Sequence, residues 1–598
     1  MLPQILCLAL LVLQEPARAP APIRLGLAVP AEPVAEVERA FREGAELAAA
    51  IRNRRGGLLG QALELVPLGS ARVEAEARAL APRLAGAGLV AVLAPRAGVG
   101  LDALRPAAER AGLVLLAPSI EPAAEAELLA RTLVGRLRFA RLALLQERGS
   151  GGKALASELE RRLAPPCALV ARIEVRLPAR DLAARLAEAE PDVLVADLEP
   201  ATLAALLAGP LEASRLPLVT TARATLDPAT LGREHLFVHG LSAATEEPRG
   251  EFLAEFRARH GEPGPGAVEG YELVELVAVA LERGGGVGPE DLRAALATAR
   301  LAGPRGVLQA DARGLVAVPA ALWRFVERSR PHDPPVPAEG QTIPDGAGRA
   351  PEARLGPPFG ALRTDGFLPE PGSRTVRLHF GGGDARSIEA DLARLGLATG
   401  GASPVLDHLV REELLARTLA IVSQKYLRAP DGAPIPGQSL RVTFVAHLPQ
   451  SAARGAWEAV LAGADPSANG RAFPGSGVCH VFATNWLATV QAHALEVPLG
   501  PDDLGLLDGT YVFGSDYRKD ARSELVRALI AGYASSLGLT TAHEVGHLFD
   551  LDHDTGDPQS LMNVDGDEIG LAPEDAHFTE AALELLRKNP GVVKGDGK

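Results

Sequence analysis

The sequence predicts an α/β protein in two parts, a larger region of alternating strands and helices followed by a smaller α+β domain. From residue 23 to about residue 327, short apolar runs alternate with longer amphipathic stretches, which is typical of strand–helix units around a mostly parallel sheet. Beyond Ser373, strand-like runs precede one long helical stretch. A chain of 598 residues is also too long for a single core, so we expect several folding units.

Composition and charge exclude some classes of protein. Hydrophobic residues make up 47% of the chain and charged residues 23%, which is typical of globular proteins. The net charge is -14, and no block is rich in Lys or Arg, so we expect no nucleic-acid partner. Only Cys7, Cys167 and Cys479 are present, which excludes a disulfide scaffold.

Residues 1–21 are predicted to be a secretory signal peptide. An apolar run over residues 5–13 is followed by Ala-x-Ala patterns that end at Ala19 or Ala21. The run is too short to cross a bilayer, so we expect no transmembrane segment. The protein is therefore expected to be exported, to the periplasm or the extracellular space.

Residues 22–327 contain strand-like runs separated by helix-like stretches. The stretch VAEVERAFREGAELAAAIRNR has apolar residues at helical spacing and stops at Gly56 and Gly57. The strand-like runs begin at residues 23, 62, 89, 113, 140, 168, 192, 216 and 235.

Four segments of this region carry a resemblance: FREGAELAAAIRNRRGGLLGQALELV, LVAVLAPRAGVGLDALRPAAERAGLVLLAPS, GYELVELVAVALERGGGVGPEDLRAAL and GPRGVLQADARG. Together they resemble the type I periplasmic binding proteins that take up leucine and other branched-chain amino acids. The resemblance implies two α/β lobes with a small, amino-acid-like ligand held between them. It places the crossovers between the lobes near Ser119, near Ser242 and near Gly306.

Candidate ligand contacts follow from the same resemblance. Gly98 aligns with a loop residue that usually offers a small hydroxyl group to the ligand carboxylate, so the ligand chemistry of this chain departs from that of the family. Ser119 would supply a hydroxyl group, and Glu246 or Glu247 an acidic group. The competing interpretation is structural: Ser119 ends a strand, and the two glutamates are solvated.

Residues 328–372 are predicted to be a linker, because they are rich in Pro and Gly and lack periodicity. The domain that follows, residues 373–598, should contain strands near residues 375, 440, 478 and 509. It should also contain helices over 405–427 and from about residue 519 to 549. We expect the strand around Cys479 to be the sheet edge to which an extended peptide adds itself.

The segment AHEVGHLFDLDHDTGDPQSLMN, residues 542–563, predicts a catalytic zinc site. His543 and His547 are four residues apart, so on a helix they project from one face and can hold one ion. His553 supplies a third ligand if the helix stops and the chain turns back, which leaves one coordination position open. Glu544 would flank that position and act as the general base, taking a proton from zinc-bound water as it attacks a carbonyl group.

This segment resembles the metzincin zinc peptidases, whose pattern H-E-x-x-H-x-x-G-x-x-H it matches at every position but one. The resemblance implies an endopeptidase that acts on a peptide or protein substrate, with Met562 in a tight turn beneath the metal. The exception is Asp550, which stands where the family usually has Gly. That position commonly requires a left-handed backbone, which Asp tolerates at a cost of roughly 1–2 kcal/mol.

Some roles around the zinc site stay open between alternatives. Carboxylates that follow the second ligand are candidates to orient the imidazole rings, and His577 is a candidate donor to the transition state. The carboxylates are Asp552, Asp554 and Asp557. The alternative interpretation of the whole chain is a solute-binding or sensor protein whose C-terminal domain binds a metal without turnover.

Overall fold

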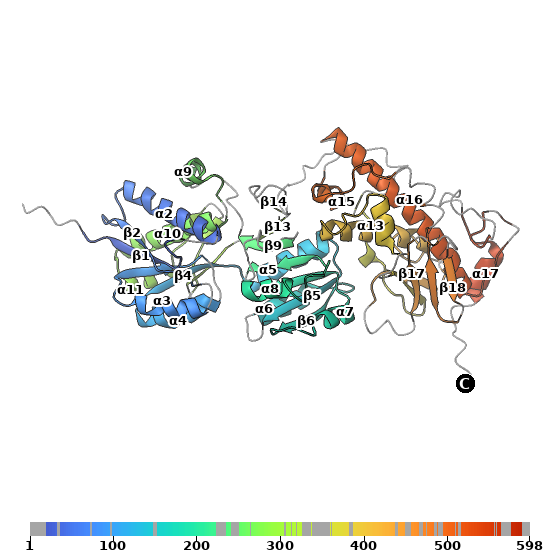
Figure 1. Cartoon of the computed structure of the whole chain (residues 1–598), viewed down its shortest axis with the longest axis horizontal. Coiled ribbons are helices and arrows are strands. Elements are labelled where there is room, and N and C mark those ends of the chain that lie inside the picture. The colour runs from blue at the N-terminus through green and yellow to red at the C-terminus, as the bar shows by residue number, and fades with distance from the viewer. Residues whose placement is uncertain are drawn as a thin grey trace, which may run out of the picture. The chain divides into compact units, whose positions relative to one another are not determined.

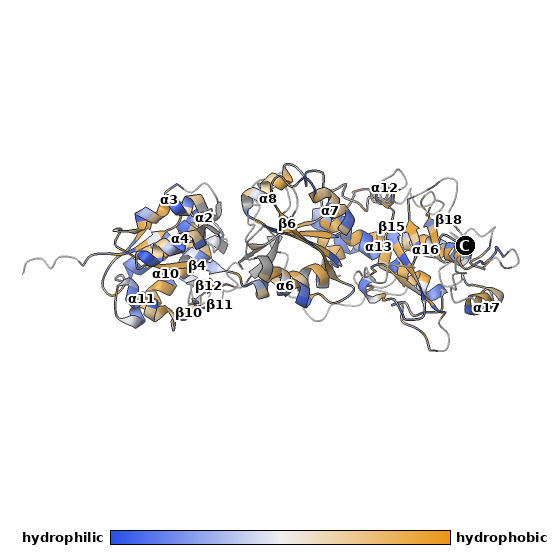
Figure 2. Cartoon of the chain, turned by 90° about the horizontal axis from the view of Figure 1, so that it is seen from below, coloured by the Kyte–Doolittle hydropathy of each residue, from blue (hydrophilic) through white to orange (hydrophobic). Residues whose placement is uncertain are grey.

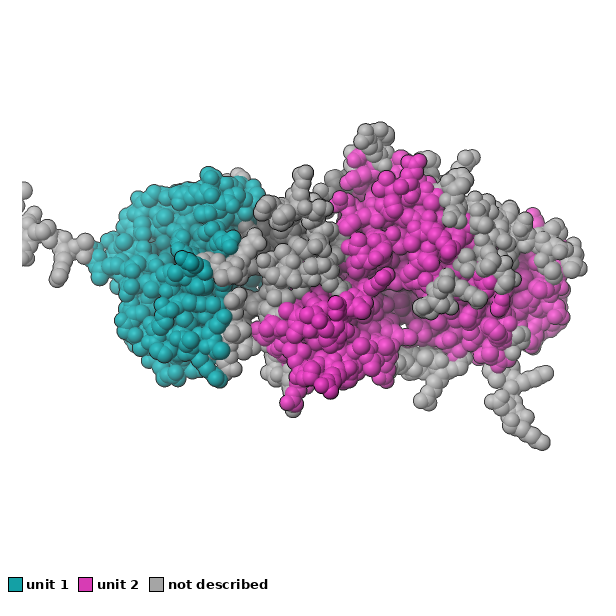
Figure 3. Space-filling model, in the orientation of Figure 1, with its two compact units in different colours: residues 1–125, 221–230, 237–321 teal, residues 126–220, 231–236, 322–598 magenta. Residues whose placement is uncertain are grey.

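The structure is a computed structural model, and it divides into two compact units (Figure 3). Unit 1 comprises residues 1–125, 221–230 and 237–321, and unit 2 comprises residues 126–220, 231–236 and 322–598. The structure describes residues 20–588 apart from 33–35, 72–73, 96–98, 148–151, 223–234, 241–249, 264, 304–305, 312–313, 319, 326–335, 338–358, 360, 382–386, 437–439, 449–455, 464, 466–469, 474, 484–486, 488–493, 509, 512–515, 555–556, 558 and 564–575.

Unit 1 is built on a five-stranded parallel sheet with the order β12-β4-β3-β1-β2. Its strands are β1 Ile23–Leu27, β2 Leu63–Pro67, β3 Leu89–Leu93, β4 Val114–Ser119 and β12 Leu315–Ala317. Its helices are α2 Glu36–Arg54, α3 Glu74–Leu84, α4 Val99–Arg110, α9 Gly250–His260, α10 Pro265–Gly284 and α11 Pro289–Leu296. A hairpin of β10 Leu301–Gly303 and β11 Gly306–Leu308 follows α11.

Helices cover both faces of this sheet, as a parallel sheet requires (Figure 1). One apolar cluster joins the sheet to α2 and α10, and the other joins it to α3 and α4. Helices α2 and α10 approach so closely that a Cβ atom at Gly270 would overlap the carbonyl oxygen of Phe41. Glycine at this position therefore sets the spacing of the two helices.

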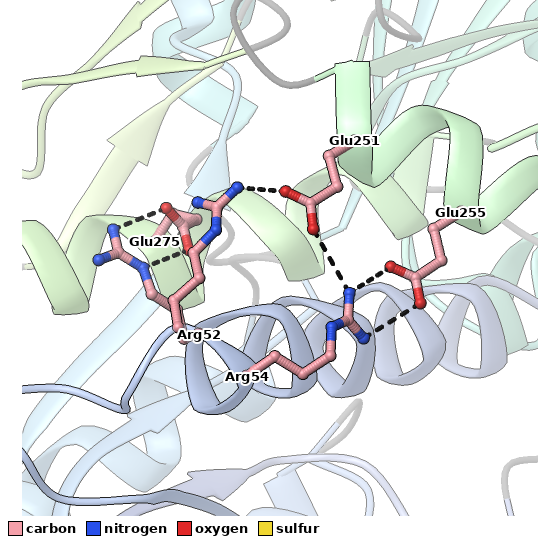
Figure 4. A network of polar contacts seen from close by, with 6 residues as sticks. Arg52, Arg54, Glu251, Glu255 and Glu275 are labelled. Carbon is pink, nitrogen blue, oxygen red and sulfur yellow. Dashed lines mark hydrogen bonds and ion pairs between the residues drawn. The ribbon is translucent and has the colours of Figure 1, made fainter.

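Arginines near the end of α2 tie this helix to α9 and α10 (Figure 4). The Arg52 guanidinium donates from Nε and Nη2 to the two carboxylate oxygens of Glu275, at 2.8 and 2.9 Å. Arg54 donates in the same two-pronged way to Glu255 of α9, at 3.1 and 2.6 Å. The sequence motif FREGAELAAAIRNR thus orients one helix against two others.

The first sheet of unit 2 has seven strands in the order β14-β13-β9-β8-β7-β5-β6. They are β5 Arg141–Glu147, β6 Ala168–Val175, β7 Val193–Asp197, β8 Leu218–Thr220, β9 His235–Gly240, β13 Ala320–Phe325 and β14 Val336–Pro337. Helices α5 Pro122–Leu129, α6 Gly152–Arg162, α7 Leu182–Ala189 and α8 Pro200–Leu207 accompany it, with a π-helix, η1, over Ala130–Arg136. We call the part of unit 2 formed by residues 126–220 the second lobe.

The nine strand-like runs of the N-terminal region all form strands, β1 to β9, so that part of the prediction is confirmed. The chain passes between the units after residues 125, 220, 230, 236 and 321, and the expected crossovers near Ser119 and Ser242 are each six residues from one of these positions. The crossover expected at Gly306 is wrong, since Gly306 lies in the hairpin of β10 and β11. The three-residue strands of this hairpin are too short to be recognised from sequence.

Residues 373–588 form a second sheet with the order β16-β15-β17-β19-β18. The strands are β15 Arg374–Phe380, β16 Val442–Val445, β17 Trp457–Leu461, β18 Gly470–Phe473 and β19 Val478–Val481. The first four strands of this order are parallel, and β18 is antiparallel to β19. The helices are α12 Ile388–Arg394, α13 Pro404–Lys425, α15 Leu504–Leu507, α16 Tyr517–Leu548 and α17 Glu580–Lys588, and a short 3-10 helix, η4, covers Thr364–Gly366. We call this part, together with η4, the zinc domain, after the metal site that its sequence predicts.

Two predictions for this domain are wrong. Cys479 lies in β19, between β17 and β18, so the edge strand is β18. The run near residue 509 is not a strand at residues 510–511, and its other residues lie outside those described. Strands β17 and β18 were not predicted, because runs of four or five residues with mixed polarity carry little periodicity.

Helices α13 and α16 of the zinc domain pack side by side (Figure 1). A Cβ atom at Gly538 of α16 would lie 2.7 Å from the side chain of Ile421, so these helices meet at close range. The described helices carry both hydrophilic and apolar residues (Figure 2). Among them, none has both the length and the apolar character needed to cross a membrane.

Candidate metal centre

Three histidines meet at the end of α16. Their Nε2 atoms lie close together: 3.0 Å from His543 to His547, 3.1 Å from His547 to His553 and 3.3 Å from His553 to His543. His543 is buried, His547 is partly buried, and His553 is exposed. In the described part of the chain, this is the one group of three or more potential ligands close enough to share an ion.

The geometry of this group fits zinc. Nitrogens bonded to one tetrahedral zinc ion at about 2.0–2.1 Å stand roughly 3.3–3.4 Å apart, so the observed separations need only a slight expansion. Three imidazole ligands leave one position for a water molecule or a substrate. The residues that the sequence selects as ligands are therefore the residues that the fold brings together.

Backbone carbonyl groups orient two of the three rings. His543 Nδ1 lies 2.5 Å from the carbonyl oxygen of Leu561, and His547 Nδ1 lies 2.8 Å from that of Leu551. With Nδ1 as the donor, the lone pair of Nε2 points toward the shared centre. The sequence suggested aspartates for this role; it missed the carbonyl groups because every residue carries one, so no residue type signals them.

A tight helix end returns the chain to the metal centre. Asp550 has φ of 61°, the left-handed conformation that its place in the motif predicts. The N–H groups of Asp550 and Leu551 donate to the carbonyl oxygens of His547 and Gly546, at 3.0 and 3.1 Å, which is a Schellman motif. The reversal brings His553 beside the helix that it follows.

Met562 lies in a turn beneath the histidines. The N–H group of Asn563 donates to the carbonyl oxygen of Ser560 at 3.1 Å, which closes a turn around Met562. The methionine is 1% exposed, and a Cβ atom at Gly546 would stand 2.7 Å from its sulfur. Gly546 lies between His543 and His547 on the helix, so Met562 supports the helix at the two candidate ligands.

Glu544 is buried beside the sheet edge. Its side chain is on α16, is 7% exposed, and lies against Gly470 of β18. Cys479, on the neighbouring strand, is fully buried. Burial and then the Glu544 charge raise the pKa of the Cys479 thiol, so this thiol stays neutral and is a poor metal ligand.

Burial also favours the neutral form of two of the candidate metal-binding rings. It lowers the pKa of His543 to about 4, although the hydrogen bond to Leu561 opposes this shift. The pKa of His553 is lowered as well, first by burial and then by His547. Because only a neutral imidazole binds a metal, these shifts favour occupancy at neutral pH.

The remaining predicted site residues are placed as follows. Ser119 ends β4 and is partly exposed, and its carbonyl oxygen accepts a hydrogen bond from the N–H group of Val318 at 3.0 Å. Gly98 and Glu246 lie outside the described residues. His577 Nε2 lies 3.2 Å from a carboxylate oxygen of Asp557.

Comparisons with known proteins bear on the N-terminal half. A family model described as periplasmic binding protein matches residues 22–320, and that match ends well before the histidines. No curated protein matches the chain.

Three solved structures are similar to the same half. A leucine-binding protein from Thermotoga maritima is 18% identical, with a TM-score of 0.42, over 51% of this chain and 95% of that one. An ABC transporter substrate-binding protein from Desulfitobacterium hafniense, in complex with Leu, is 22% identical, with a TM-score of 0.43, over 51% and 98%. A branched-chain amino acid transporter substrate-binding protein from Streptococcus pneumoniae, in complex with isoleucine, is 20% identical, with a TM-score of 0.41, over 51% and 95%.

Proposed function

Because the chain belongs to the periplasmic binding protein family through residues 22–320, we propose that its N-terminal region binds a small, amino-acid-like solute. The family match also supports the expectation of an exported, periplasmic protein. Within unit 1, Ser119 supports the proposal, since it stands at the carboxyl end of a parallel strand and is partly exposed. Ligands of open α/β sheets bind at that end of the strands.

Solute binding is tested by thermal unfolding of the full chain with each standard amino acid, leucine first. A ligand at about 100 times its dissociation constant stabilises the folded form by about 2.7 kcal/mol and raises the melting temperature. Ser119→Ala should weaken that shift, whereas Ser214→Ala, a serine of the second lobe, should leave it unchanged. If no amino acid raises the melting temperature, the amino-acid assignment fails.

We propose, as the second function, that the zinc domain hydrolyses peptide bonds. The observation that supports this is the convergence of three Nε2 atoms at the end of a helix that also carries a buried glutamate, Glu544. Zinc bound there would polarise the substrate carbonyl group and make water more acidic. Glu544 would accept the proton of the attacking water at a carboxylate oxygen and pass it to the leaving nitrogen as the C–N bond breaks.

The sheet edge offers a place for the substrate. Strand β18 ends the strand order, and its residue Gly470 touches Glu544. An extended peptide that adds itself to this edge by backbone hydrogen bonds would pass beside the general base. Backbone pairing of this kind suits an endopeptidase that acts on unfolded segments.

The alternative is a solute-binding or sensor protein whose zinc domain holds the metal without turnover. The family match favours it, because that match supports binding and does not extend to the histidines. The resemblance to metzincins depends on the motif in residues 543–553 and on Met562, and the two readings share the zinc site. They differ in one property, the cleavage of a peptide bond.

One experiment separates these readings: zinc content and cleavage of casein, measured together on wild type, Glu544→Ala and the control Glu524→Ala from the same helix. The peptidase proposal expects about one zinc per chain in all three proteins, with cleavage lost only in Glu544→Ala. Zinc without cleavage in wild type favours the sensor protein. Absence of zinc in wild type contradicts the metal centre itself.

A further inference from the structure

The second lobe inserts a turn into the zinc domain, within unit 2. The turn, residues 137–140, connects η1 to β5. At its centre Arg138 has φ of 60° and is only 6% exposed. Its guanidinium donates to a carboxylate oxygen of Glu413 on α13 at 2.7 Å and to the carbonyl oxygen of Leu507 on α15 at 2.9 Å. A non-glycine residue in this backbone conformation is strained unless its surroundings hold it there.

Both members of the ion pair, Arg138 and Glu413, are buried. The side chain of Glu413 is 0% exposed, and it also accepts a hydrogen bond from Arg417 of its own helix at 2.9 Å. Beside it, Phe139 stacks on His408 of α13, with the ring centroids 4.1 Å apart. Removal of one partner from a buried pair of this kind is strongly destabilising, because the other charge stays behind without solvent.

Further contacts between the second lobe and the zinc domain surround the Arg138–Glu413 pair. Arg136 of the second lobe donates to Asp508 at 2.8 Å, and the side chain of Asp508 is 1% exposed. Arg363 donates to the carbonyl oxygens of Val134 and Gly135 at 2.9 and 2.7 Å. Arg363 belongs to the segment that was predicted as a linker, and its contacts show that the end of this segment is part of a packed interface.

Helix α13 leads from this interface to the metal centre. It has 22 residues, so it extends about 33 Å as one rigid element. Its first half contacts the second lobe through His408 and Glu413, and near its other end Ile421 packs on Gly538 of α16. Directly after α13, the hydroxyl group of Tyr426 donates to the carbonyl oxygen of Ala542 at 3.2 Å, one residue before the first zinc ligand.

We infer that the second lobe is an integral part of the zinc domain, joined to it through Arg138, Phe139, His408 and Glu413, and that this joint positions the zinc helix through α13. Glu413 and Arg138 are positioning residues in this arrangement. The zinc readout below depends on the proposed zinc site, whereas the exchange readout does not.

The inference is tested by hydrogen exchange on the full chain, with one change on each side of the joint. Arg138→Met alters the second lobe, and Glu413→Gln alters the zinc domain. Each variant should raise the exchange rate on the opposite side: Arg138→Met in α13 and α16, and Glu413→Gln in residues 130–147. Arg161→Met, which removes an exposed arginine of the second lobe, is the matched control and should change neither.

Zinc affinity, measured by competition with a chelator, gives the second readout. Variants along a coupling route commonly change an affinity by roughly two- to thirtyfold, so both variants should bind zinc that much more weakly than wild type and the control. Asp508→Asn, at the rim, should show a smaller change of the same sign, and it serves if the central variants do not fold. Exchange effects confined to the altered side, with unchanged zinc affinity, overturn the inference. If wild type binds no zinc, the proposed function fails while the exchange result still decides on the joint.

Discussion

Gly470 of β18 and Glu544 of α16 occupy adjoining space, and a Cβ atom on the glycine would stand 2.5 Å from the carboxylate carbon of the glutamate. Such a distance is far shorter than a van der Waals contact between carbon atoms. The carboxylate of Glu544, the proposed general base, therefore occupies the space that a side chain at position 470 of the edge strand would need. The absence of a side chain on the strand lets the carboxylate take its place.

Gly470→Ala should displace the Glu544 side chain while the histidines stay in place. We expect proteolysis to fall by at least about tenfold, within the range that general acid–base catalysis supplies, with the zinc content unchanged. Gly500→Ala is the control, because a Cβ atom there meets nothing within 4 Å. Full activity in Gly470→Ala would show that the carboxylate does not need its present position.

Met562 should act through packing. Met562→Ala would leave a cavity beneath Gly546 and should lower the free energy of unfolding by about 2–5 kcal/mol. Met562→Leu keeps most of the volume and should lower it by less than about 1.5 kcal/mol. Denaturant unfolding of the metal-free protein measures both, and equal losses in the two variants would contradict a packing role.

Asp550 should tolerate glycine but not a β-branched residue. Asp550→Gly should keep the free energy of unfolding within about 1 kcal/mol of wild type, because relief of the left-handed backbone offsets the added freedom of the unfolded chain. Asp550→Val should lose about 1–2 kcal/mol and bind zinc more weakly, since the turn carries His553. Chelator competition checks the zinc affinity, and normal binding in Asp550→Val would argue against a demanding turn.

Removal of the metal should destabilise the zinc domain. A protein saturated at about 100 times the dissociation constant for zinc loses about 2.7 kcal/mol when a chelator takes the ion away. His547→Ala should already melt like the metal-free protein and should not respond to the chelator. His260→Ala, far from the ligands in the sequence, should respond as wild type does.

Stability should depend on pH through His408. Burial holds the pKa of His408 well below the ordinary value of 6.5, so the folded chain rejects a proton that the unfolded chain binds. As pH falls below about 6.5, the free energy of unfolding should therefore decrease, by at most about 1.4 kcal/mol per pH unit for one group. The loss should continue until pH reaches the folded pKa of His408.

Comparison with His408→Gln isolates this contribution. Burial raises the pKa of the neighbouring Glu412, which acts in the opposite sense and stabilises the fold as pH falls. Both proteins retain Glu412, along with Arg138, Arg411 and His447 around the site, so the difference between their pH profiles reports His408. Parallel profiles between pH 7 and 5 would contradict the assignment.

The sequence alone determined the repeating strands and helices of the N-terminal half and the histidines that meet in the candidate metal centre. Strands β1 to β9 are apolar runs separated by amphipathic stretches, and that periodicity is a local property. His543, His547 and Glu544 are fixed by helical spacing, and the left-handed turn at Asp550 followed from its place in the motif. Local spacing is enough for these features because each involves residues close in the chain.

Only the tertiary structure decided which groups surround the site and how the two halves of unit 2 are joined. The edge strand beside Glu544 proved to be β18, whose register depends on pairing with β19 rather than on its own pattern. The carbonyl group that orients His543 comes from Leu561, 18 positions away, and the partner of Arg138 is Glu413, 275 positions away. Contacts of this kind depend on how separate elements pack, which no local pattern of residues specifies.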